Sequence, residues 1–424
     1  MRNITEPARQ TPVLFEADVV VCGAGAAGIA AAVCAAREGL SVALIEAAPI
    51  PGGMVTNVTQ WMTDYKNKGG FVREFITWLT ENKAFSPAFG INKTYYNPFL
   101  VVPHFDELIA AHKIRVLYLT QVVASMRRDD GAVSGVIVES RAGRAAILGK
   151  VVIDATGDGA VAALSGAAYK QGRDPDGAVQ AISQSQLFLN HITPELSSAQ
   201  MTAIVEAAAA KSGAPYWYPY NHFHPFTVVG TTNTLIHTVP HATGINPCDA
   251  AQLSDALIEC RRQALELFLL LKNNTEEFAA AEFGPFLGLP GVRESRRIVC
   301  DYELTEKNLD EGLRLDDGLF TVAQSVDIHR RDRVEEAIIG RKVAPYHFPY
   351  RSMLPRGIEG LLVIGRAAGM SHIALASCRM ISHCMSMGEA AAIAARLSIH
   401  AGVLPRAADT AALAAEMKSR GYEI

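Results

Sequence analysis

The segment Val19-Val20-Val21-Cys22-Gly23-Ala24-Gly25-Ala26-Ala27-Gly28 is an apolar run that ends in the spacing G-x-G-x-x-G. Small residues with helical character follow over 29–37, and a second apolar run covers 41–45, directly before Glu46. This order predicts a strand, a glycine turn, a helix and a second strand that ends at an acid.

Each glycine of this turn has a separate physical role. Gly23 lets the chain turn tightly out of the strand, Gly25 leaves no side chain in the way of a pyrophosphate, and Gly28 lets the helix pack close to the sheet. The helix N-terminus offers N–H groups and a partial positive charge to phosphate oxygens. Glu46 lies 18 positions after Gly28, where a carboxylate can accept hydrogen bonds from ribose hydroxyls. The segment therefore predicts a dinucleotide-binding unit.

Composition and charge exclude several other classes of protein. The uncharged run over 19–36 is about long enough to span a bilayer, but the glycine turn and the flanking Asp18 and Arg37 favour a buried unit. With 49% hydrophobic residues among 424 the chain can bury a large core, and its net charge of −4 gives no reason to expect a nucleic-acid partner. The first seventeen residues lack the apolar core of a signal peptide, and no other run suggests a membrane span. The seven scattered cysteines form no C-x-x-C pair, which predicts neither a disulfide framework nor a zinc site and favours a reducing cytoplasm.

The rest of the chain interrupts this unit and then completes it. We expect the first part of the dinucleotide-binding domain over 1–167, a substrate domain over 168–350, and a completing strand with C-terminal helices over 351–424. Residues 70–82 are expected to form an amphipathic helix.

Apolar runs and turn signals predict the finer elements. Four runs separated by turns indicate an antiparallel meander with strands over 114–119, 121–126, 132–139 and 145–153. The substrate domain is expected to hold two long helices, over about 195–211 and 249–281, and the C-terminal part a long helix from Arg379 to about His400.

These pieces together resemble the FAD-dependent oxidoreductases of the glutathione-reductase-like fold, which are distantly similar to fumarate reductase and succinate dehydrogenase flavoproteins. The motifs that carry the resemblance are GAGAAG with Glu46, the pair Gly52-Gly53, VVIDATGDGAVAALSGA from Val151, LPGVRESRRI from Leu289, and GLLVIGRAAG…HIALASCRMISHCMSMGEAAA from Gly360. The resemblance implies an α/β protein with a Rossmann-like FAD/NAD(P)-binding fold of the glutathione-reductase type and an inserted α+β substrate domain.

The resemblance also implies which residues contact FAD. By position, these are Gly23, Gly25, Ala26, Ala27 and Gly28 at the pyrophosphate, Glu46 with the adjacent Ala47 at the adenosine ribose, Gly52, Gly53 and Met54 beside the ribityl chain and ring, Val123 at adenine, Ala155, Thr156 and Gly157 over the adenosine half, Gly365 and Arg366 at the ribityl-phosphate, and Met380 and Ile381 at the pyrimidine edge.

Four departures from related flavoproteins qualify this picture. Many relatives place Asp where Arg366 stands, which changes the polarity of the contact to the ribityl chain. No histidine precedes His104, so we expect FAD to be bound without a covalent link. The redox-active cysteine pair of the disulfide reductases and a second, NAD(P)-binding unit are both missing.

Four residues are candidates for catalysis: His372, Arg379, Arg293 and Arg296. His372 could act as a general acid or base beside the flavin ring, or be a buried histidine bonded to backbone. Arg379 is expected in the first turn of a helix that begins near Ser377, where a cation opposes the helix dipole; it could serve the flavin or a bound carboxylate, or bridge to a surface carboxylate. Arg293 and Arg296 could clamp an anionic substrate, or belong with Glu294 and Arg297 to an ion-pair network between domains.

Two further features favour structural interpretations. The aromatic segment 216–226 could wall the pocket or pack a domain edge, and its His222 and His224 have no acid or cysteine at ligand spacing, so no metal site is predicted. Cys378 could lie near the flavin, but a small buried residue is the better interpretation.

The chain is therefore expected to be a cytoplasmic FAD enzyme that oxidises a small organic substrate by two-electron, hydride transfer. Oxygen, a quinone or a protein would then accept the electrons. Alternatives are reduction of an activated C=C bond as in fumarate reductases, a flavin monooxygenase, an NAD-only dehydrogenase and a non-enzymatic electron-transfer flavoprotein. Substrate identity, electron acceptor and the formation of a homo-oligomer are left open by the sequence.

Overall fold

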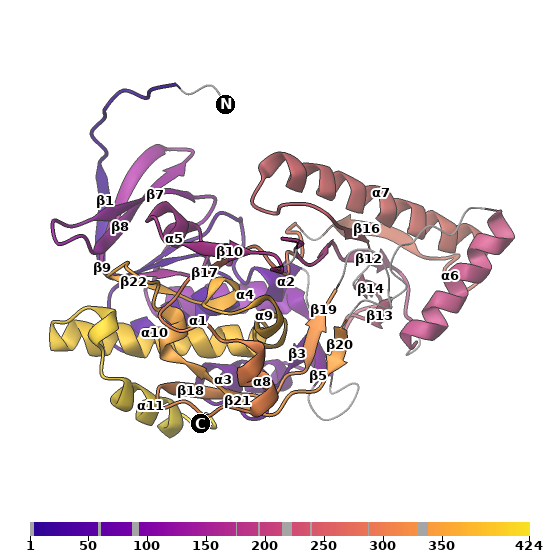
Figure 1. The fold of residues 1–424 in the computed structure, drawn as a ribbon. Coiled ribbons are helices and arrows are strands. Elements are labelled where there is room, and N and C mark those ends of the chain that lie inside the picture. The colour runs from indigo at the N-terminus through magenta and orange to yellow at the C-terminus, as the bar shows by residue number, and fades with distance from the viewer. Residues whose placement is uncertain are drawn as a thin grey trace.

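The computed structural model describes residues 4–57, 61–86, 93–174, 176–193, 196–213, 223–237, 240–286, 288–329 and 338–424. A seven-stranded sheet lies in the left-hand part of the molecule in Figure 1, in the order β6-β2-β1-β9-β8-β7, with β22 also paired to β9. Parallel pairing joins β6, β2, β1, β9 and β22, and antiparallel pairing joins β9, β8 and β7. The strands are β1 (Val13–Cys22), β2 (Val42–Ile45), β6 (Arg115–Leu117), β7 (Gln121–Arg127), β8 (Val133–Ser140), β9 (Gly143–Asp154) and β22 (Leu361–Val363). This mixed α/β architecture confirms the predicted fold class.

Strand β9 connects the early and late parts of the chain. One of its edges pairs with β1, while the other takes β8 in its first half and β22 over Val152–Asp154. The expectation that 114–119 begins the meander is wrong, because β6 pairs in parallel with β2 at the opposite edge of the sheet. That pairing follows a long crossover that contains three helices, a connection of the kind that parallel neighbours require.

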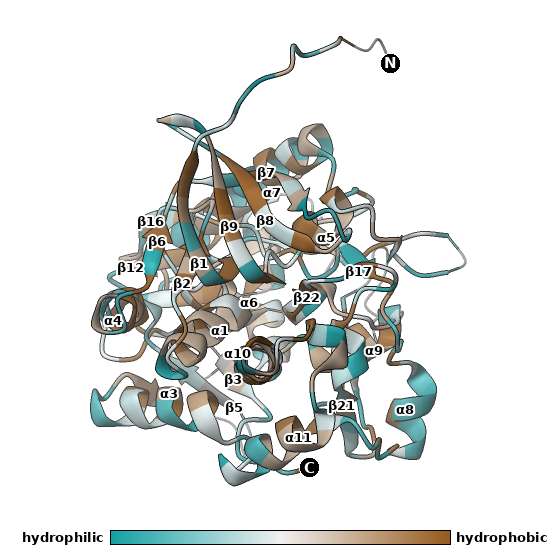
Figure 2. Cartoon of the chain, turned by 90° about the vertical axis from the view of Figure 1, so that its left-hand side faces the viewer, coloured by the Kyte–Doolittle hydropathy of each residue, from teal (hydrophilic) through white to brown (hydrophobic). Residues whose placement is uncertain are grey.

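Helices α1 (Ala26–Arg37) and α10 (Ile381–Ala401) pack against each other beneath this sheet (Figure 2). Gly388 permits the contact, since a Cβ there would lie 2.2 Å from the carbonyl oxygen of Ala27. Both helices are rich in buried alanine, so their backbones approach closely. The remaining helices of this half are α2 (Met54–Asn57), α3 (Gly70–Glu81), α4 (Pro98–Ala111), α5 (Ala160–Leu164) and α11 (Thr410–Ser419).

A lower layer closes the core beneath α1 and α10. It contains the sheet β3-β5-β4, the pair β18-β21 and the helix α8. Their bounds are β3 (Trp61–Thr63), β4 (Phe85–Ser86), β5 (Lys93–Tyr96), β18 (Gly318–Val322), β21 (Tyr346–Pro349) and α8 (Glu306–Glu311). Helix α9 (His372–Cys378) lies at the level of α10 in Figure 1.

A buried ion pair joins this layer to the first turn of α10. Lys68 donates to Asp64 (3.1 Å) and to the carbonyl oxygen of Thr321 (2.7 Å), and the side chains of both ionic residues are almost completely buried. His383 of α10 lies 2.8 Å from the same Asp64 carboxylate, which also accepts from the Ala323 N–H. Burial alone would raise the pKa of Asp64, but His383 and Lys68 lower it to about 2.

The inserted unit is the right-hand lobe of Figure 1. Two helices cover the four-stranded sheet β13-β14-β12-β16, and the two layers share a separate hydrophobic core around Phe188, Phe268 and Phe278. Its elements are α6 (Ser198–Ser212), α7 (Ala250–Asn274), β12 (Gln186–Leu189), β13 (His224–Thr227), β14 (Thr234–His237) and β16 (Glu282–Phe286). The second helix thus ends earlier than the expected 281.

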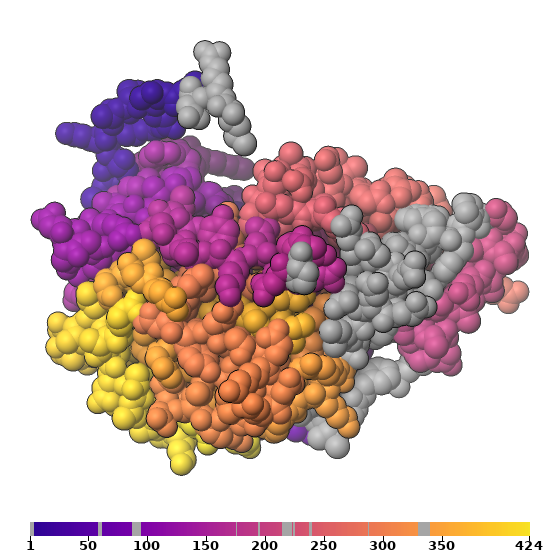
Figure 3. Space-filling view, in the orientation of Figure 1, coloured from indigo at the N-terminus to yellow at the C-terminus, as the bar shows by residue number. Residues whose placement is uncertain are grey.

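The core of the nucleotide-binding half extends into the middle of the chain. Leu304, Phe320 and Tyr346 pack in the same cluster as α1 and α10, although they fall within the expected substrate domain. On the face shown in Figure 3, the N-terminal part (purple) and the C-terminal part (orange to yellow) form one body, with α6 (pink) at the right-hand edge. The domain boundaries at 168 and 350 stay a prediction.

The remaining elements are short. They are β10 (Tyr169–Gln171) with β17 (Arg296–Ile298), β11 (Ile182–Ser183) with β15 (His241–Ala242), β19 (Val326–Ile328) with β20 (Ile338–Arg341), and the 3-10 turns η2 (Tyr350–Met353), η3 (Gly365–Ala367) and η4 (Pro405–Ala407). Among the residues that the structure describes, no helix has the length and apolar character needed to cross a membrane.

Candidate functional site

Two glycines of the first turn are required by the fold itself. Gly23 has a φ of +99°, and a Cβ there would lie 2.5 Å from the carbonyl oxygen of Ala155. A Cβ on Gly28 would lie 1.8 Å from the carbonyl oxygen of Gly23. Both positions are therefore closed to any side chain by neighbouring backbone.

Gly25 is different, because nothing in the protein requires glycine there. Its φ of −69° and ψ of −173° suit any residue, and an added Cβ would meet nothing within 4 Å. Gly25 is also the N-cap of α1, which has no side-chain cap and no acid in its first turn. An open space in front of uncapped N–H groups fits the phosphates of a dinucleotide.

The loop that carries Gly52 and Gly53 lies directly against this turn. The Gly52 N–H donates to the carbonyl oxygen of Ala24 (2.7 Å), and a Cβ on Gly53 would lie 3.0 Å from the Cα of Gly25. Positive φ angles of +101° and +52° suit glycine at both positions. Met54, the next residue, begins α2.

Glu46 ends β2 at the mouth of the turn. Its carboxylate accepts from the N–H groups of Ala24 (2.6 Å) and Ala48 (2.7 Å). Burial raises the pKa of Glu46, and hydrogen bonds from Ala48, Ala24 and Ala47 oppose the rise. The carboxylate is thus held beside the backbone of the glycine turn.

Val123 lies in an irregularity of β7. Val122 pairs with Val138 and Ala124 with Ile137, so Val123 is left outside the register with β8. The start of this strand lies beside Glu46, whose carbonyl oxygen accepts from the N–H of Thr120 (3.0 Å).

The segment after β9 reaches the same place from the other side. Asp154 is completely buried and accepts from the backbone and the hydroxyl of Thr156, and the N–H of Ala155 donates to the carbonyl oxygen of Cys22. Gly157 has a φ of +76°, and the Nη2 atom of Arg366 would lie 2.9 Å from a Cβ added there.

Arg366 is tied to residues near this segment. It donates to Asp158 (2.8 Å) and to the hydroxyl of Ser295 (3.1 Å). Gly365 has a φ of +74°, and a Cβ there would lie 3.4 Å from the Cβ of Ala27. The structure thus brings the C-terminal segment to the N-terminus of α1.

The expectation of one helix from Arg379 to His400 is wrong at its start. Helix α9 ends at Cys378 with Arg379 as its C-cap, and α10 begins at Ile381 with Met380 as its N-cap. Arg379 therefore follows the negative end of α9, where the helix dipole favours a cation. The N-terminus of α10 has neither a side-chain cap nor an acid in its first turn.

His372 is the first residue of α9, not part of a turn before it. Its Nδ1 atom lies 2.8 Å from the fully buried carboxylate of Glu294, which also pairs with Arg297. The side-chain partner of His372 is thus a carboxylate, not the backbone carbonyl of the alternative interpretation.

The side chains of Arg293 and Arg296 contact different parts of the protein. Arg293 is buried and donates to the carbonyl oxygen of Ala181 (2.9 Å) and the hydroxyl of Ser183 (3.0 Å), on the side of the inserted unit. Arg296 donates to the carbonyl oxygen of Asp158 (3.3 Å), and its guanidinium lies over a tyrosine ring.

Arg379 meets two residues that sequence reasoning missed. Its Nη2 atom donates to the carbonyl oxygen of Asp327 (3.0 Å) and to Oε1 of Gln180 (3.3 Å). The Asp327 carboxylate lies 3.2 Å from the Nε2 atom of His329. Neither Gln180 nor Asp327 lies in a recognisable motif, and each is far from Arg379 in sequence, so no local signal could have found them.

Charges set the protonation of this cluster. Burial alone would raise the pKa of Asp327, but His329, Arg379 and Arg293 hold it well below its usual range. Burial and the Arg293 cation lower the pKa of His329 to about 4, despite the Asp327 carboxylate. At neutral pH the cluster therefore holds an ionised Asp327 and a neutral His329.

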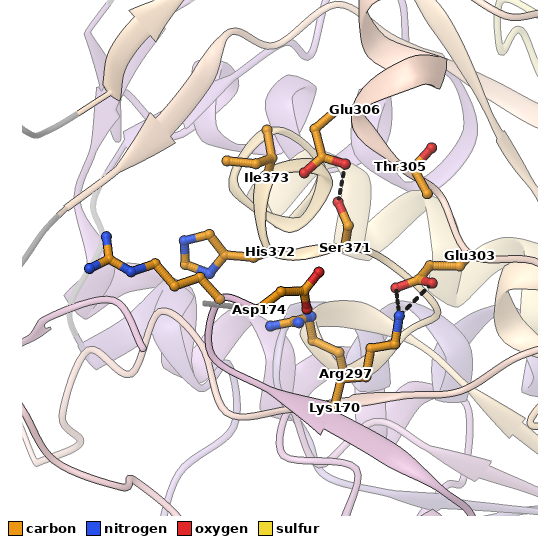
Figure 4. A pocket seen from close by; sticks show the side chains of 10 residues that line it. Lys170, Asp174, Arg297, Glu303, Thr305, Glu306, Ser371, His372 and Ile373 are labelled. Atoms are coloured by element: carbon orange, nitrogen blue, oxygen red, sulfur yellow. Dashed lines mark hydrogen bonds and ion pairs between the residues drawn. The ribbon is translucent and has the colours of Figure 1, made fainter. Parts of the chain in front are cut away.

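A hollow of about 820 Å³, including its open mouth, lies beside His372. Figure 4 shows His372 at this hollow, with the contacts Lys170–Glu303 (2.8 Å) and Ser371–Glu306 (3.1 Å) as dashed lines. Because the hollow opens to solvent and touches His372, it gives that ring access to water.

The aromatic segment 216–226 and Cys378 were the remaining features singled out in the sequence. Residues 216–222 of the aromatic segment, His222 included, lie outside the described residues, as does the side chain of His224. In the described part of the chain no group of three or more His, Cys, Asp or Glu residues could hold a metal ion. Burial raises the pKa of Cys378 well above its usual range, so this thiol is protonated.

Comparisons with known proteins agree with this geometry. A family model described as FAD dependent oxidoreductase matches residues 18–417. A geranylgeranyl bacteriochlorophyll reductase-like protein from Thermoplasma acidophilum is similar in structure, with a TM-score of 0.50 and 13% identity over 95% of this chain and 82% of that one. The p-nitrophenol 4-monooxygenase PnpA from Pseudomonas putida DLL-E4 has a TM-score of 0.48 and 13% identity over 92% and 81% of the two chains. None of the curated proteins matches this chain.

Proposed function

Because this chain belongs to the family of FAD-dependent oxidoreductases, whose cofactor is FAD, we propose that it binds FAD non-covalently and oxidises a small organic molecule by removing two electrons. When bound, FAD supplies the electron chemistry, since its ring accepts a hydride. The residues of this chain bind and orient the two molecules and move the proton.

The proposed FAD contacts are those expected from the sequence. The proposal assigns the pyrophosphate to the open space at Gly25 and the N–H groups of Ala26 and Ala27, and the adenosine ribose to Glu46. The N–H groups of Ala24 and Ala48 hold the Glu46 carboxylate, so ribose hydroxyls would reach a carboxylate that is already oriented. The full proposed set is Gly23, Gly25, Ala26, Ala27, Gly28, Glu46, Ala47, Gly52, Gly53, Met54, Val123, Ala155, Thr156, Gly157, Gly365, Arg366, Met380 and Ile381.

The observation that carries the oxidation is the charge at the start of α10. Its N-terminus has no acid in the first turn and no side-chain cap, so its positive end is not neutralised locally. A positive environment at the pyrimidine edge favours negative charge there, and hydride acceptance by FAD creates such charge.

His372 is the proposed proton acceptor. The Glu294 carboxylate at 2.8 Å orients the ring, and the adjacent hollow lets the proton leave to water. Arg293 and Arg379 are proposed to bind substrate, whereas Arg296 contacts the Asp158 backbone and has a supporting role.

Partners and location are proposals as well. The reduced enzyme would pass its electrons to oxygen, a quinone or a protein. A cytoplasmic location fits the seven cysteines, all of them unpaired.

An anaerobic screen tests the reaction. The purified yellow protein is mixed with small acids, alcohols, amines and sugars, and loss of flavin absorbance is recorded. We expect at least one class of compound to bleach the flavin, with the heat-denatured protein as control. Bleaching by NADH alone, or reoxidation of a pre-reduced enzyme only by compounds with an activated C=C bond, would contradict the proposal.

A further inference from the structure

Two hydrogen-bond donors near the start of α10 have no partner in the described part of the chain. All the hydrogen bonds of the Arg379 guanidinium run through Nη2, while its Nε atom is buried and unbonded. Gln180 is 2% exposed; its Oε1 atom accepts from Arg379, and its Nε2 atom is buried and unbonded. The two orphaned donors thus belong to two side chains that are hydrogen-bonded to each other.

Buried donors without acceptors are rare in folded proteins because the lost solvation is not repaid. Two of them on neighbouring side chains indicate a missing acceptor. The acceptor must reach a guanidinium, whose planar fork matches the two oxygens of a carboxylate.

The charges nearby favour a negative ligand. Arg379 is a permanent cation, and it shares the Asp327 carboxylate with Arg293 and His329. Glu294 is balanced by Arg297. Arg366, which also lies close, is paired with Asp158. Arg379 therefore shares its nearest carboxylate with other groups, and an anion beside its unbonded Nε atom would add a negative charge of its own.

Gln180 also connects these donors to the proposed proton acceptor. Its backbone N–H donates to the carboxylate of Glu294 (3.2 Å), the group that binds His372. A ligand held by the side chains of Gln180 and Arg379 would thus lie near the His372 ring.

We propose that Arg379 and Gln180 bind the carboxylate of the substrate, so that this enzyme acts on a small organic acid. The ligand is called a substrate because the proposal rests on the proposed oxidation. The existence of an anion-binding site does not depend on that reaction. The alternative acceptor is a carbonyl of the flavin. The contacts of Arg379 with Gln180 and Asp327 argue against it, because they direct the side chain toward β11 and β19.

The test compares a carboxylate with its neutral amide. The oxidised holoenzyme is titrated with lactate, with lactamide and with inorganic phosphate, and binding is read from the flavin spectrum and from the shift in melting temperature. We expect lactate to bind at least tenfold more tightly than lactamide, and phosphate more weakly than lactate. Equal affinity for lactate and lactamide, or a preference for phosphate, would overturn the proposal.

Two variants locate the site. Arg379→Gln removes the charge and Gln180→Glu places a negative charge of nearly the same shape beside it; both should lower lactate affinity at least tenfold and leave lactamide affinity within about twofold. Arg379→Lys should restore part of the lactate affinity. Arg262→Gln, which removes an exposed arginine of α7, is the control and should change neither.

The outcomes separate this proposal from the proposed oxidation. Lactate binding that Arg379→Gln abolishes, in a protein whose flavin no compound bleaches, would support the anion site and contradict the oxidation. Bleaching by neutral compounds alone, without lactate binding, would support the oxidation and contradict the anion site. A lower FAD content in Arg379→Gln with unchanged lactate affinity would assign Arg379 to the flavin and overturn the inference.

Discussion

Replacement of Gly25 by alanine should weaken FAD binding without harming the fold. The new Cβ meets nothing within 4 Å, and the backbone angles suit alanine. Alanine is a poorer N-cap than glycine, but it also reduces the entropy of the unfolded chain. The two effects oppose each other, so the free energy of unfolding of the apoprotein should change by no more than about 0.5 kcal/mol.

The cofactor should respond much more strongly. The methyl group enters the space proposed for the pyrophosphate and displaces phosphate oxygens from the N–H groups of α1. Loss of one hydrogen bond to a charged group costs about 1.5–3 kcal/mol, which corresponds to a Kd roughly tenfold to hundredfold higher.

Gly28→Ala provides the matched comparison. It adds the same methyl group three residues later, where it would lie 1.8 Å from the carbonyl oxygen of Gly23. This variant should lose about 2 kcal/mol or more of apoprotein stability. Urea unfolding followed by circular dichroism measures stability, and FAD titration followed by flavin fluorescence measures affinity. If Gly25→Ala binds FAD like the unchanged protein, or destabilises the apoprotein as much as Gly28→Ala, the assignment of the space to phosphate is wrong.

Four further results are expected. Gly388→Leu should lower the free energy of unfolding by about 1–3 kcal/mol, because its side chain would collide with the Ala27 backbone; an unchanged urea midpoint would contradict the packing of α1 on α10. Lys68→Met should cost about 3–5 kcal/mol, since it leaves the Asp64 carboxylate buried without its cation, and a neutral effect in the same assay would show that the ion pair is dispensable. The folded-state pKa of His329, about 4, lies below its unfolded value of about 6.5. The unfolded chain therefore binds more protons between these two values, and the free energy of unfolding should fall by at most about 3 kcal/mol on acidification from pH 6.5 to 4. His329→Gln should flatten this pH dependence, and an equal slope in both proteins would refute the expectation. Removal of FAD should lower the melting temperature, because a ligand at a hundred times its Kd stabilises the folded state by about 2.7 kcal/mol, and equal melting of apoprotein and holoenzyme would argue against tight binding.

Local sequence signals predicted the parts of the fold that local physics determines. The turn at Gly23 needs a positive φ, and the helix after it needs small residues against the sheet. One short segment of sequence therefore predicts both features. The amphipathic helix expected over 70–82 is confirmed by α3 (Gly70–Glu81) for the same reason.

Features that depend on distant partners could not be predicted in this way. The break between α9 and α10 has no sequence signal, because Met380 caps α10 without a side-chain hydrogen bond and the surrounding small residues all suit a helix. Strand β6 was assigned to the meander since its true partner, β2, lies about 70 residues earlier. In the candidate site, the motif after Gly360 points to His372 and Arg379, which stay predictions, whereas Gln180 and Asp327 come from segments that only the tertiary structure brings to them.

The double use of one edge of β9 has a consequence for synthesis of the chain. When Asp154 leaves the ribosome, the edge at Val152–Asp154 has no neighbour, because β22 is encoded about 200 residues later. At about 5–20 residues per second, the nascent chain waits roughly 10–40 s for this strand. Throughout that interval an apolar edge and the α10-facing side of α1 stay uncovered, which makes them natural sites for a chaperone and makes truncated products prone to aggregate.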